Sequence, residues 1–285
     1  ISAMGASAIV IYLSLADTDT MSPQRIAKLL PPDDEFNNAR ERLSALPDTD
    51  TALAAAIGAA PVVLGFVPSN NATGTDPSLK VPAASLKNAN TGTLLSFPVA
   101  TNALQQLQDA ASGYGSFPVI ARGTTTVRQL PLFVSINKNV YPSLTAEALR
   151  VHADSDHYAL SFHGPLPWLP ATTWLNNTKV TIGSLNIATD SATRFWPYFR
   201  WDNPFQHISA WKILAGKIGE KRIRNKLILV GSSASGLSSR VTTPLGQSVP
   251  GIAIQAQAIE SILGEAFLTR EGWADLAEII ISLML

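Results

Sequence analysis

The stretch Lys-Leu-Ile-Leu-Val at residues 226–230, closed by Gly231, decides the fold class of this chain. Four aliphatic residues in succession that end at a glycine predict a short strand buried on both faces, the kind found in parallel sheets. Two further apolar runs, at residues 7–15 and 61–67, are rich in Val or Ile and also predict buried strands. These runs therefore predict a core of strands that helices cover.

Helix signals alternate with these strands. Ser22 and Pro23 have the residue types of an N-cap and a first helical turn, and Asp48 or Asp50 can cap the alanine-rich segment that follows. Helices are predicted at 23–30, 33–46, 51–59, 104–111, 142–153, 208–214 and 251–263, and further strands at 127–136, 157–162, 179–182 and 194–200. The alternation predicts an α/β fold with a mixed, mainly parallel sheet flanked by helices, in a single large domain. Residues 68–93, rich in Pro, Asn, Thr, Gly and Ser, are predicted to form a long polar loop insertion.

The composition excludes several classes of protein. The chain has 285 residues, with 21 Lys and Arg against 21 Asp and Glu, so its formal net charge is zero. A dedicated nucleic-acid-binding protein normally carries a basic excess, and we therefore expect no nucleic-acid partner. The absence of cysteine excludes disulfides, thiolate chemistry, cysteine-based zinc sites and iron–sulfur clusters.

Charge is unevenly distributed along the chain. Residues 194–226 contain eight basic and two acidic residues, whereas residues 17–50 contain eight acidic and four basic ones. The interpretation that we favour is a pair of solvated faces on opposite sides of the molecule. The alternative is an anion site, or a contact with acidic headgroups near a membrane.

Two apolar stretches raise the question of a membrane span. Residues 51–75 carry no charge, but Gly58 and Pro61 interrupt them, which favours a helix followed by a strand. The chain ends in Ile-Ile-Ile-Ser-Leu-Met-Leu at 279–285. Two interpretations stay open for this end: a continuation into a membrane helix, or a buried amphipathic helix. We expect residues 1–270 to form the main domain and residues 271–285 to form a C-terminal helix that leads toward a membrane span.

Residues 231–236, Gly-Ser-Ser-Ala-Ser-Gly, follow a predicted strand and can be compared with two catalytic motifs. A phosphate-binding loop requires a lysine after the second glycine, and Leu237 occupies that position. A nucleophile elbow requires a glycine where Ser235 stands. What remains is a Gly/Ser turn that exposes backbone N–H groups at the carboxyl end of a strand, where open α/β sheets bind ligands.

Other patterns predict no catalytic or metal site. The histidines do not have the spacing of metal ligands, and they stand at positions 152, 157, 163 and 207. We therefore expect no metal and no cofactor. Five aromatic residues are interleaved with Arg194 and Arg200 within 194–201, and the favoured interpretation is a strand whose alternate aromatics fill the core. A cation–π platform or a subunit contact is the alternative.

Several segments together resemble a known family. Residues 225–237, the pair Thr243-Pro244 and residues 250–263 resemble the closing segment of the second type of CHASE domain, a sensory extracellular domain associated with cyclases and histidine kinases. Residues 46–65 resemble its acidic helix and following strand, and residues 127–149 its middle strand and helix. Phe267-Leu268 and Trp273 resemble the run into the next membrane helix. The resemblance covers nearly the whole chain, in the same order.

The chain departs from the family pattern at several polar positions. Ser239 stands where the family has an aspartate, Thr124-Thr125 replaces an Asp-Gly pair, and Tyr12 occupies the acidic position of the first strand. A Glu-x-His-Ala stretch is replaced by residues that include Ala253, Gln255 and Ala256. The opening strand and helix of the family are expected upstream of Ile1.

The resemblance implies a periplasmic or extracytoplasmic sensor domain of a membrane-anchored bacterial receptor, without catalysis of its own. The implied partners are an unknown small molecule or envelope component, a linked cytoplasmic cyclase or kinase, and a second copy of the chain in a homodimer. The resemblance and the Gly/Ser turn together indicate five polar residues as candidate ligand contacts: Ser232, Ser233, Ser235, Thr243 and Arg128. Two alternatives stay open: an α/β hydrolase-like enzyme that uses a serine within 232–235, and a dimerisation module without a ligand.

Overall fold

The computed structural model describes residues 1–70, 74–78, 80, 93–118, 126–163, 177–203, 206–234, 240–268 and 273–284. Its helices are η1 (Ser2–Met4), α1 (Pro23–Leu29), α2 (Asp34–Ala45), α3 (Thr49–Gly58), α4 (Gln105–Ala110), α5 (Leu144–His152), α6 (Ala210–Leu214), η4 (Glu220–Arg222), α7 (Gly251–Leu263) and α8 (Trp273–Met284). Its strands are β1 (Ala8–Tyr12), β2 (Val62–Ser69), β3 (Ser96–Phe97), β4 (Val99–Thr101), β5 (Gly113–Ser116), β6 (Leu130–Pro131), β7 (Phe133–Ile136), β8 (Asn139–Pro142), β9 (Tyr158–His163), β10 (Asn177–Ile182), β11 (Leu185–Thr189), β12 (Arg194–Pro197), β13 (Leu227–Gly231), β14 (Arg240–Thr242), β15 (Ser248–Pro250) and β16 (Phe267–Leu268). The predicted α/β class and the single domain are confirmed.

The central sheet is mainly parallel, as predicted. Strands β13, β1, β2 and β5 lie side by side in this order, and every neighbouring pair is parallel. Strand β4 pairs in the antiparallel direction with the end of β2. The first strand of the sequence therefore lies at the centre of the sheet, between β2 and the much later β13.

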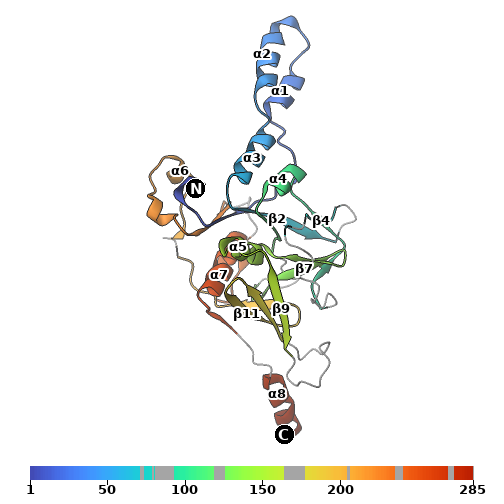
Figure 1. Cartoon of the computed structure of the whole chain (residues 1–285), viewed down its shortest axis with the longest axis vertical. Helices are drawn as coiled ribbons and strands as arrows, with labels where there is room; N and C mark the ends of the chain where they lie inside the picture. The colour runs from blue at the N-terminus through green and yellow to red at the C-terminus, as the bar shows by residue number, and fades with distance from the viewer. Residues whose placement is uncertain are drawn as a thin grey trace.

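Helices cover both faces of this sheet. Side chains alternate between the two faces along a strand, so Val10 and Val63 join one hydrophobic cluster with α5 and α7. Their neighbours Ile9 and Val62 join a second cluster with α3 and α4. In Figure 1, α3 and α4 lie above the sheet and α5 and α7 below it. The sheet is thus the middle layer between two cores.

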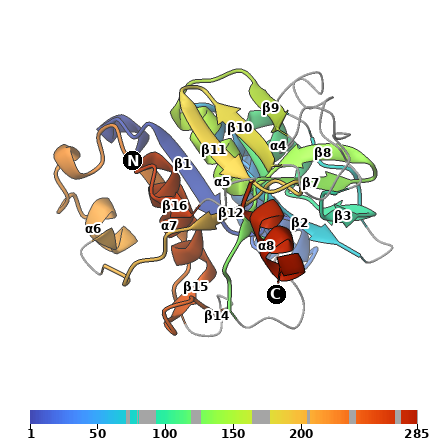
Figure 2. The same cartoon turned by 90° about the horizontal axis from the view of Figure 1, so that it is seen from below.

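Smaller sheets complete the body. Strands β9, β10 and β11 form an antiparallel sheet beside α5, and Figure 2 shows it on the side of the molecule away from the β14–β15 hairpin. Strands β6, β12 and β16 form a second small sheet, and β3, β7 and β8 a third. These additions explain why the whole fold is mixed although its central strands are parallel.

Two sequence-based expectations need correction. The aliphatic run at 226–230 predicts a buried strand, but β13 is only partly buried, because among the described strands it has β1 as a neighbour on one side alone. The single strand predicted at 127–136 is divided at Leu132 into β6, which pairs with β12, and β7, which pairs with β8. The polar loop expected at 68–93 lies mostly outside the described residues, but its described part contains Thr75, which bridges to Ala100.

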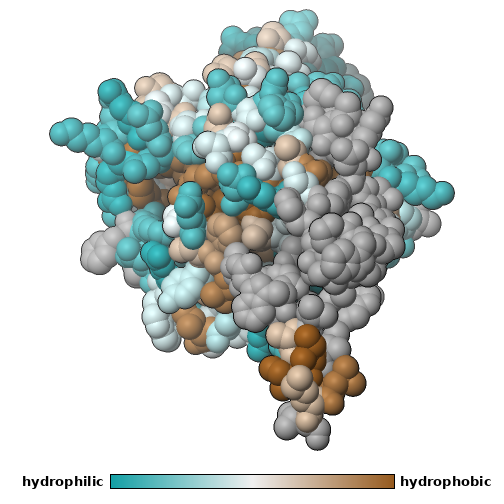
Figure 3. Space-filling view, turned by 60° about the horizontal axis from the view of Figure 1, so that its bottom comes forward, coloured by the Kyte–Doolittle hydropathy of each residue, from teal (hydrophilic) through white to brown (hydrophobic). Residues whose placement is uncertain are grey.

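Two helical segments project from the body. Helices α1 and α2 form an arm at the top of Figure 1, joined to the body through α3. Helix α8 projects at the opposite end, and Figure 3 shows it as an apolar extension. Its exposed residues include Leu283 and Met284, each 82% exposed. Within the residues that the structure describes, no helix combines the length and the apolar character needed to cross a membrane.

Candidate functional site

The carboxyl edge of the central sheet contains a topological switch point. The chain passes from β1 to β2 on one side, whereas β13 returns to the other side of β1. In open α/β sheets, ligands bind in the crevice outside the carboxyl ends of the strands where the strand order reverses in this way. The residues at the ends of β1 and β13 are therefore the first place to look for a binding site.

Tyr12 ends β1 and lies directly opposite Gly231, the last residue of β13. Its side chain reaches the beginning of α7, where a methyl group built on Gly251 would lie 2.7 Å from the Tyr12 hydroxyl oxygen. The hydroxyl is thus held against the N-terminal turn of that helix. Gly251 allows this approach because it has no side chain.

Gly231 also permits a close approach, in this case between the end of β13 and α7. A Cβ atom at this position would lie 2.7 Å from the Ile252 Cδ1 atom and 3.2 Å from the Tyr12 carbonyl oxygen. The glycine therefore lets α7 pack closely over the end of β13. Together, Tyr12, Gly231 and Gly251 bring two strand ends and a helix N-terminus to one place.

The environment of Tyr12 keeps its hydroxyl neutral. Burial raises the pKa of Tyr12 to about 12, because a phenolate would be poorly solvated there. The ring meets Phe117 edge to face at a centroid distance of 5.0 Å. Phe117 follows β5 and lies so close over Gly65 that a Cβ atom there would be 2.6 Å from its Cζ atom. The Tyr12 hydroxyl therefore stays neutral to a higher pH than the hydroxyl of an exposed tyrosine.

The N-terminus of α7 adds polarity to the same edge. The first turn of a helix carries N–H groups without intrahelical partners and a partial positive charge. Pro250 is the N-cap residue, and its side chain makes no capping hydrogen bond. The Tyr12 hydroxyl and the first turn of this helix therefore lie at the same edge of the sheet.

The structure places the described members of the predicted contact set in two segments. Ser232 and Ser233 directly follow β13 at the switch point; Ser232 is partly buried and Ser233 exposed. Ser235 lies outside the described residues. Thr243 is 1% exposed in the turn between β14 and β15, and its hydroxyl has no hydrogen-bond partner among the described residues. Arg128 is exposed beside this turn, because the Val127 N–H donates to the Thr242 carbonyl over 2.9 Å.

Sequence reasoning named Tyr12 only as an altered family position and missed the part played by Gly251. Of the other altered positions, Gln255 is buried, and its side-chain oxygen accepts a hydrogen bond of 2.5 Å from the Thr145 hydroxyl. This bond ties α7 to α5. Ser239 and the pair Thr124-Thr125 lie outside the described residues.

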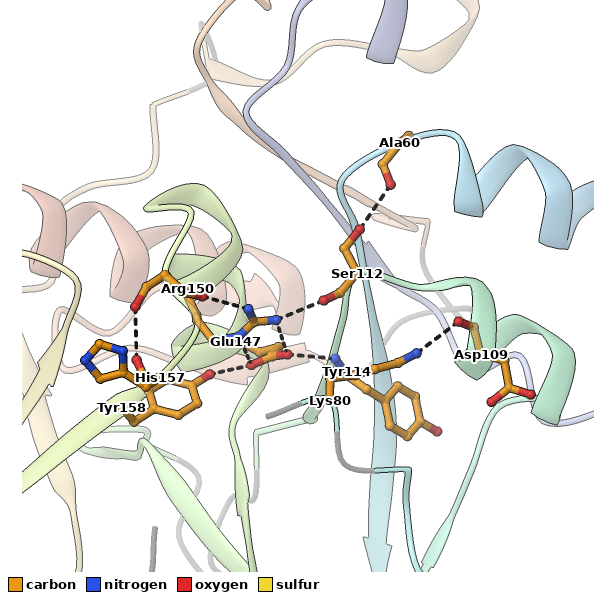
Figure 4. Close-up of polar contacts among 10 residues, drawn as sticks. Ala60, Lys80, Asp109, Ser112, Tyr114, Glu147, Arg150, His157 and Tyr158 are labelled. Atoms are coloured by element: carbon orange, nitrogen blue, oxygen red, sulfur yellow. Dashed lines mark hydrogen bonds and ion pairs between the residues drawn. The ribbon is translucent and has the colours of Figure 1, made fainter. Parts of the chain in front are cut away.

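A buried ionic network lies between α5, β5 and β9 (Figure 4). The Glu147 carboxylate accepts hydrogen bonds from the Arg150 guanidinium, the Tyr158 hydroxyl and the Tyr114 backbone N–H. Arg150 also donates to the carbonyl oxygens of Ser112 and Ser155. Glu147 is fully buried, so the network joins the central sheet to the β9–β11 sheet through α5. The sequence contains one signal for it, an acidic and a basic residue three positions apart in the predicted helix.

His152, His157 and His207 have partners other than Ser232 and Ser233 among the described residues. Ser7 lies 2.7 Å from the His152 Nδ1 atom, but this pair is at the amino end of β1, away from the switch point. His157 contacts Asp156, and His207 contacts Asp202, both at exposed positions. Among the described residues, no group of three or more His, Cys, Asp or Glu side chains is arranged to hold a metal ion.

The aromatic segment at 194–201 is divided between core and surface. Phe195 and Phe199 are buried, as the favoured interpretation predicts, whereas Tyr198 and Trp201 are 52% and 70% exposed. The Arg200 guanidinium lies 5.9 Å from the centre of the Tyr198 ring. A hollow beside them, lined also by Gln257, Glu260 and Ser261, has room for about one water molecule. This hollow is too small for a ligand larger than water.

Comparison with known proteins gives one family match. The family model of the CHASE2 domain matches residues 1–285, the whole chain. Neither the curated proteins nor the solved structures give a significant match. CHASE2 domains are extracellular sensory domains of signalling receptors and are not catalytic. Because the match covers the entire sequence, the chain belongs to the CHASE2 domain family.

Proposed function

We propose that this domain binds a small ligand or an envelope component at the switch point of its central sheet and passes the signal through α7. The receptor that contains it is a bacterial membrane protein, the domain lies in the periplasm, and the output is a cytoplasmic nucleotide cyclase or kinase. The proposal extends the sensory role of the family to a particular place in this chain.

The observation that carries the proposal is the position of the Tyr12 hydroxyl against the N-terminus of α7. Helix α7 buries Ile254, Ala258 and Ile259 in the main core, so a displacement at its first turn would act on the packing along the whole helix. Its C-terminal end runs directly into β16, which precedes α8 in the chain. A ligand at one end of α7 can therefore influence the segment at its other end.

The mechanism is a shift between two populations. A ligand that contacts both Tyr12 and the first turn of α7 stabilises the helix position in which these groups lie together. The size of the response is limited by the difference in affinity between the two positions of the helix. Because the site holds a neutral hydroxyl and backbone N–H groups, we expect a ligand with a carboxylate, phosphate or carbonyl group.

The test is a thermal shift measurement with a panel of carboxylates, phosphates, amino acids and neutral sugars. A ligand present at 100 times its dissociation constant adds about 2.7 kcal/mol to the stability of the folded state, which is readily detected. We expect the wild-type chain and a Tyr198→Phe control to respond to one class of compound, and a Tyr12→Phe variant to lose at least about tenfold in affinity for it.

Two outcomes would overturn the proposal. Equal affinity of the wild type and Tyr12→Phe for a compound that binds would move the site away from the switch point. No shift of the wild type with any class of compound would leave the dimerisation module as the better account. Stoichiometric labelling of one serine by a serine-directed covalent probe would instead favour the hydrolase alternative.

A further inference from the structure

The helical arm, defined as residues 17–50 with α1 and α2, is acidic and poorly buried. It carries eight acidic and four basic residues. Helix α2 buries no residue, and α1 buries Ala27 alone. Two short helices with so little buried surface are marginally stable in water by themselves. The arm therefore has the character of an element that gains stability when another surface covers it.

The arm also exposes apolar side chains between its charges. Met21 is 69% exposed, Leu29 79% and Leu46 49%. Its acidic residues include Glu35 and Glu41, and among the described residues no acidic side chain of the arm forms an ion pair. The arm thus combines exposed hydrophobic groups with carboxylates that form no close ion pair among the described residues.

A basic lobe, defined as residues 208–226 with α6 and η4, has the opposite charge. It contains six basic residues and one acidic residue. The exposed lysines of this lobe are Lys212, Lys217, Lys221 and Lys226. Trp211 is 53% exposed and Leu214 is 88% exposed, and the Lys217 ammonium lies 4.6 Å from the centre of the Trp211 ring. The lobe therefore presents apolar groups surrounded by positive charge.

We propose that the helical arm of one molecule docks on the basic lobe of a second copy of this chain. Both surfaces expose hydrophobic side chains, and their charges are complementary, which is the pattern of an interface with an apolar centre and a charged rim. Figure 1 shows the arm at the top of the molecule and the lobe at its left side, pointing in different directions. A two-fold symmetric pair then buries both arms and both lobes in equivalent contacts and forms a closed dimer.

Other binding partners account for only one of the two exposed surfaces or bring like charges together. An anionic membrane surface would cover the basic lobe but would leave the acidic arm exposed and would repel it. A contact between two arms, or between two lobes, would bring like charges together. A second copy is the occupant that accounts for both surfaces at once. This inference rests on the two exposed surfaces and does not depend on the ligand site at Tyr12.

The test is a charge-reversal experiment followed by sedimentation velocity of the 285-residue chain. The lobe variant is Lys217→Glu with Lys221→Glu, and the arm variant is Glu35→Lys with Glu41→Lys. We expect each variant alone to weaken the dimer by about tenfold or more, because like charges then face each other. Mixing the two variants makes both contacts of the heterodimer complementary, because the wild-type arm meets the wild-type lobe and the reversed arm meets the reversed lobe. A heterodimer therefore forms at concentrations where each variant is a monomer.

The charge-reversal experiment has a control at a residue outside the arm and the lobe. Lys179→Glu changes the charge of an exposed residue on β10, outside both surfaces, and leaves the dimer unchanged. A wild-type chain that stays monomeric at all concentrations overturns the proposal, as does a dimer that neither reversal weakens. Binding of a monomeric wild type to phosphatidylglycerol vesicles, lost in the lobe variant alone, assigns the lobe to a membrane instead. Tyr12→Phe leaves the dimer intact, so failure here is distinct from failure at the ligand site.

Discussion

The Tyr158 hydroxyl donates a hydrogen bond to the Glu147 carboxylate where both side chains are buried. Glu147 belongs to α5 and Tyr158 to β9, and the same carboxylate accepts from Tyr114 on β5. One buried charge therefore organises three elements of the fold. Such a charge is tolerated only while its hydrogen bonds and its cationic partner are in place.

Removal of the cationic partner should be strongly destabilising. We expect Arg150→Met to lower the free energy of unfolding by about 3–5 kcal/mol, because Glu147 is then buried without a counter-charge. Urea denaturation followed by circular dichroism measures the change. The matched control is Arg224→Met, which breaks an exposed pair with Glu220 and should change stability by less than about 1 kcal/mol. Similar effects of the two substitutions would contradict the structural role of the network.

Removal of the Tyr158 hydroxyl tests the same network with a smaller expected loss of stability than Arg150→Met. Tyr158→Phe keeps the ring, which meets Phe133 edge to face at a centroid distance of 5.2 Å, and deletes only the donor to Glu147. A loss of about 1–3 kcal/mol is expected for a buried hydrogen bond to a charged group. Tyr198→Phe, at an exposed tyrosine, serves as the control in the same denaturation experiment. An unchanged stability of Tyr158→Phe would show that the hydroxyl contributes nothing.

Close approach of β5 to α5 predicts a contrast between two glycines. A Cβ atom at Gly115 would lie 2.7 Å from the Ser143 carbonyl oxygen and 2.8 Å from the Leu144 backbone, which cannot move aside as a side chain can. Gly115→Ala should therefore destabilise the fold by about 1–3 kcal/mol. A Cβ atom at Gly219 would have no described atom within 4 Å, so Gly219→Ala should be nearly neutral. Equal melting temperatures of the two variants would refute this account.

Alkaline pH should reveal the burial of Tyr12. Its pKa is raised from 10.0 to about 12 in the folded state, so the neutral form is favoured by folding. The corresponding stability is fully present below pH 10 and is lost as the pH rises toward 12, because the unfolded chain ionises first. The loss is on the order of 2 kcal/mol. Between pH 10 and 12, the free energy of unfolding should therefore fall more steeply for the wild type than for Tyr12→Phe. Urea denaturation at each pH measures both curves, and parallel curves would contradict the burial of the Tyr12 hydroxyl.

Local signals predicted much of the secondary structure. Asp48, one of the two aspartates that the sequence offers as a cap, caps α3 and accepts a hydrogen bond from the Thr51 N–H. The helix predicted at 251–263 has the same limits as α7. Caps, proline positions and apolar runs act within a few residues, so the sequence shows them directly.

Features that depend on distant residues could not be predicted in this way. Strand β5 reads Gly-Tyr-Gly-Ser, a composition with little strand propensity, and it forms because Gly113 and Gly115 allow α5 to approach. The edge position of β13 follows from the strand order, and not from its own aliphatic residues. At the candidate site, Ser232 was placed correctly after a strand, but the contact between Tyr12 and Gly251 joins opposite ends of the chain.

The pairing of β1 with β13 has a consequence for how the domain is made. Ala8 is in register with Leu227, so the second strand needed beside β1 leaves the ribosome only after all the residues between the two strands have been synthesised. Until then β1 has one open edge, which is a surface for mispairing. Contacts of such long sequence separation also slow folding. A chain interrupted before residue 227 should therefore accumulate as an aggregation-prone species and not as a smaller stable domain.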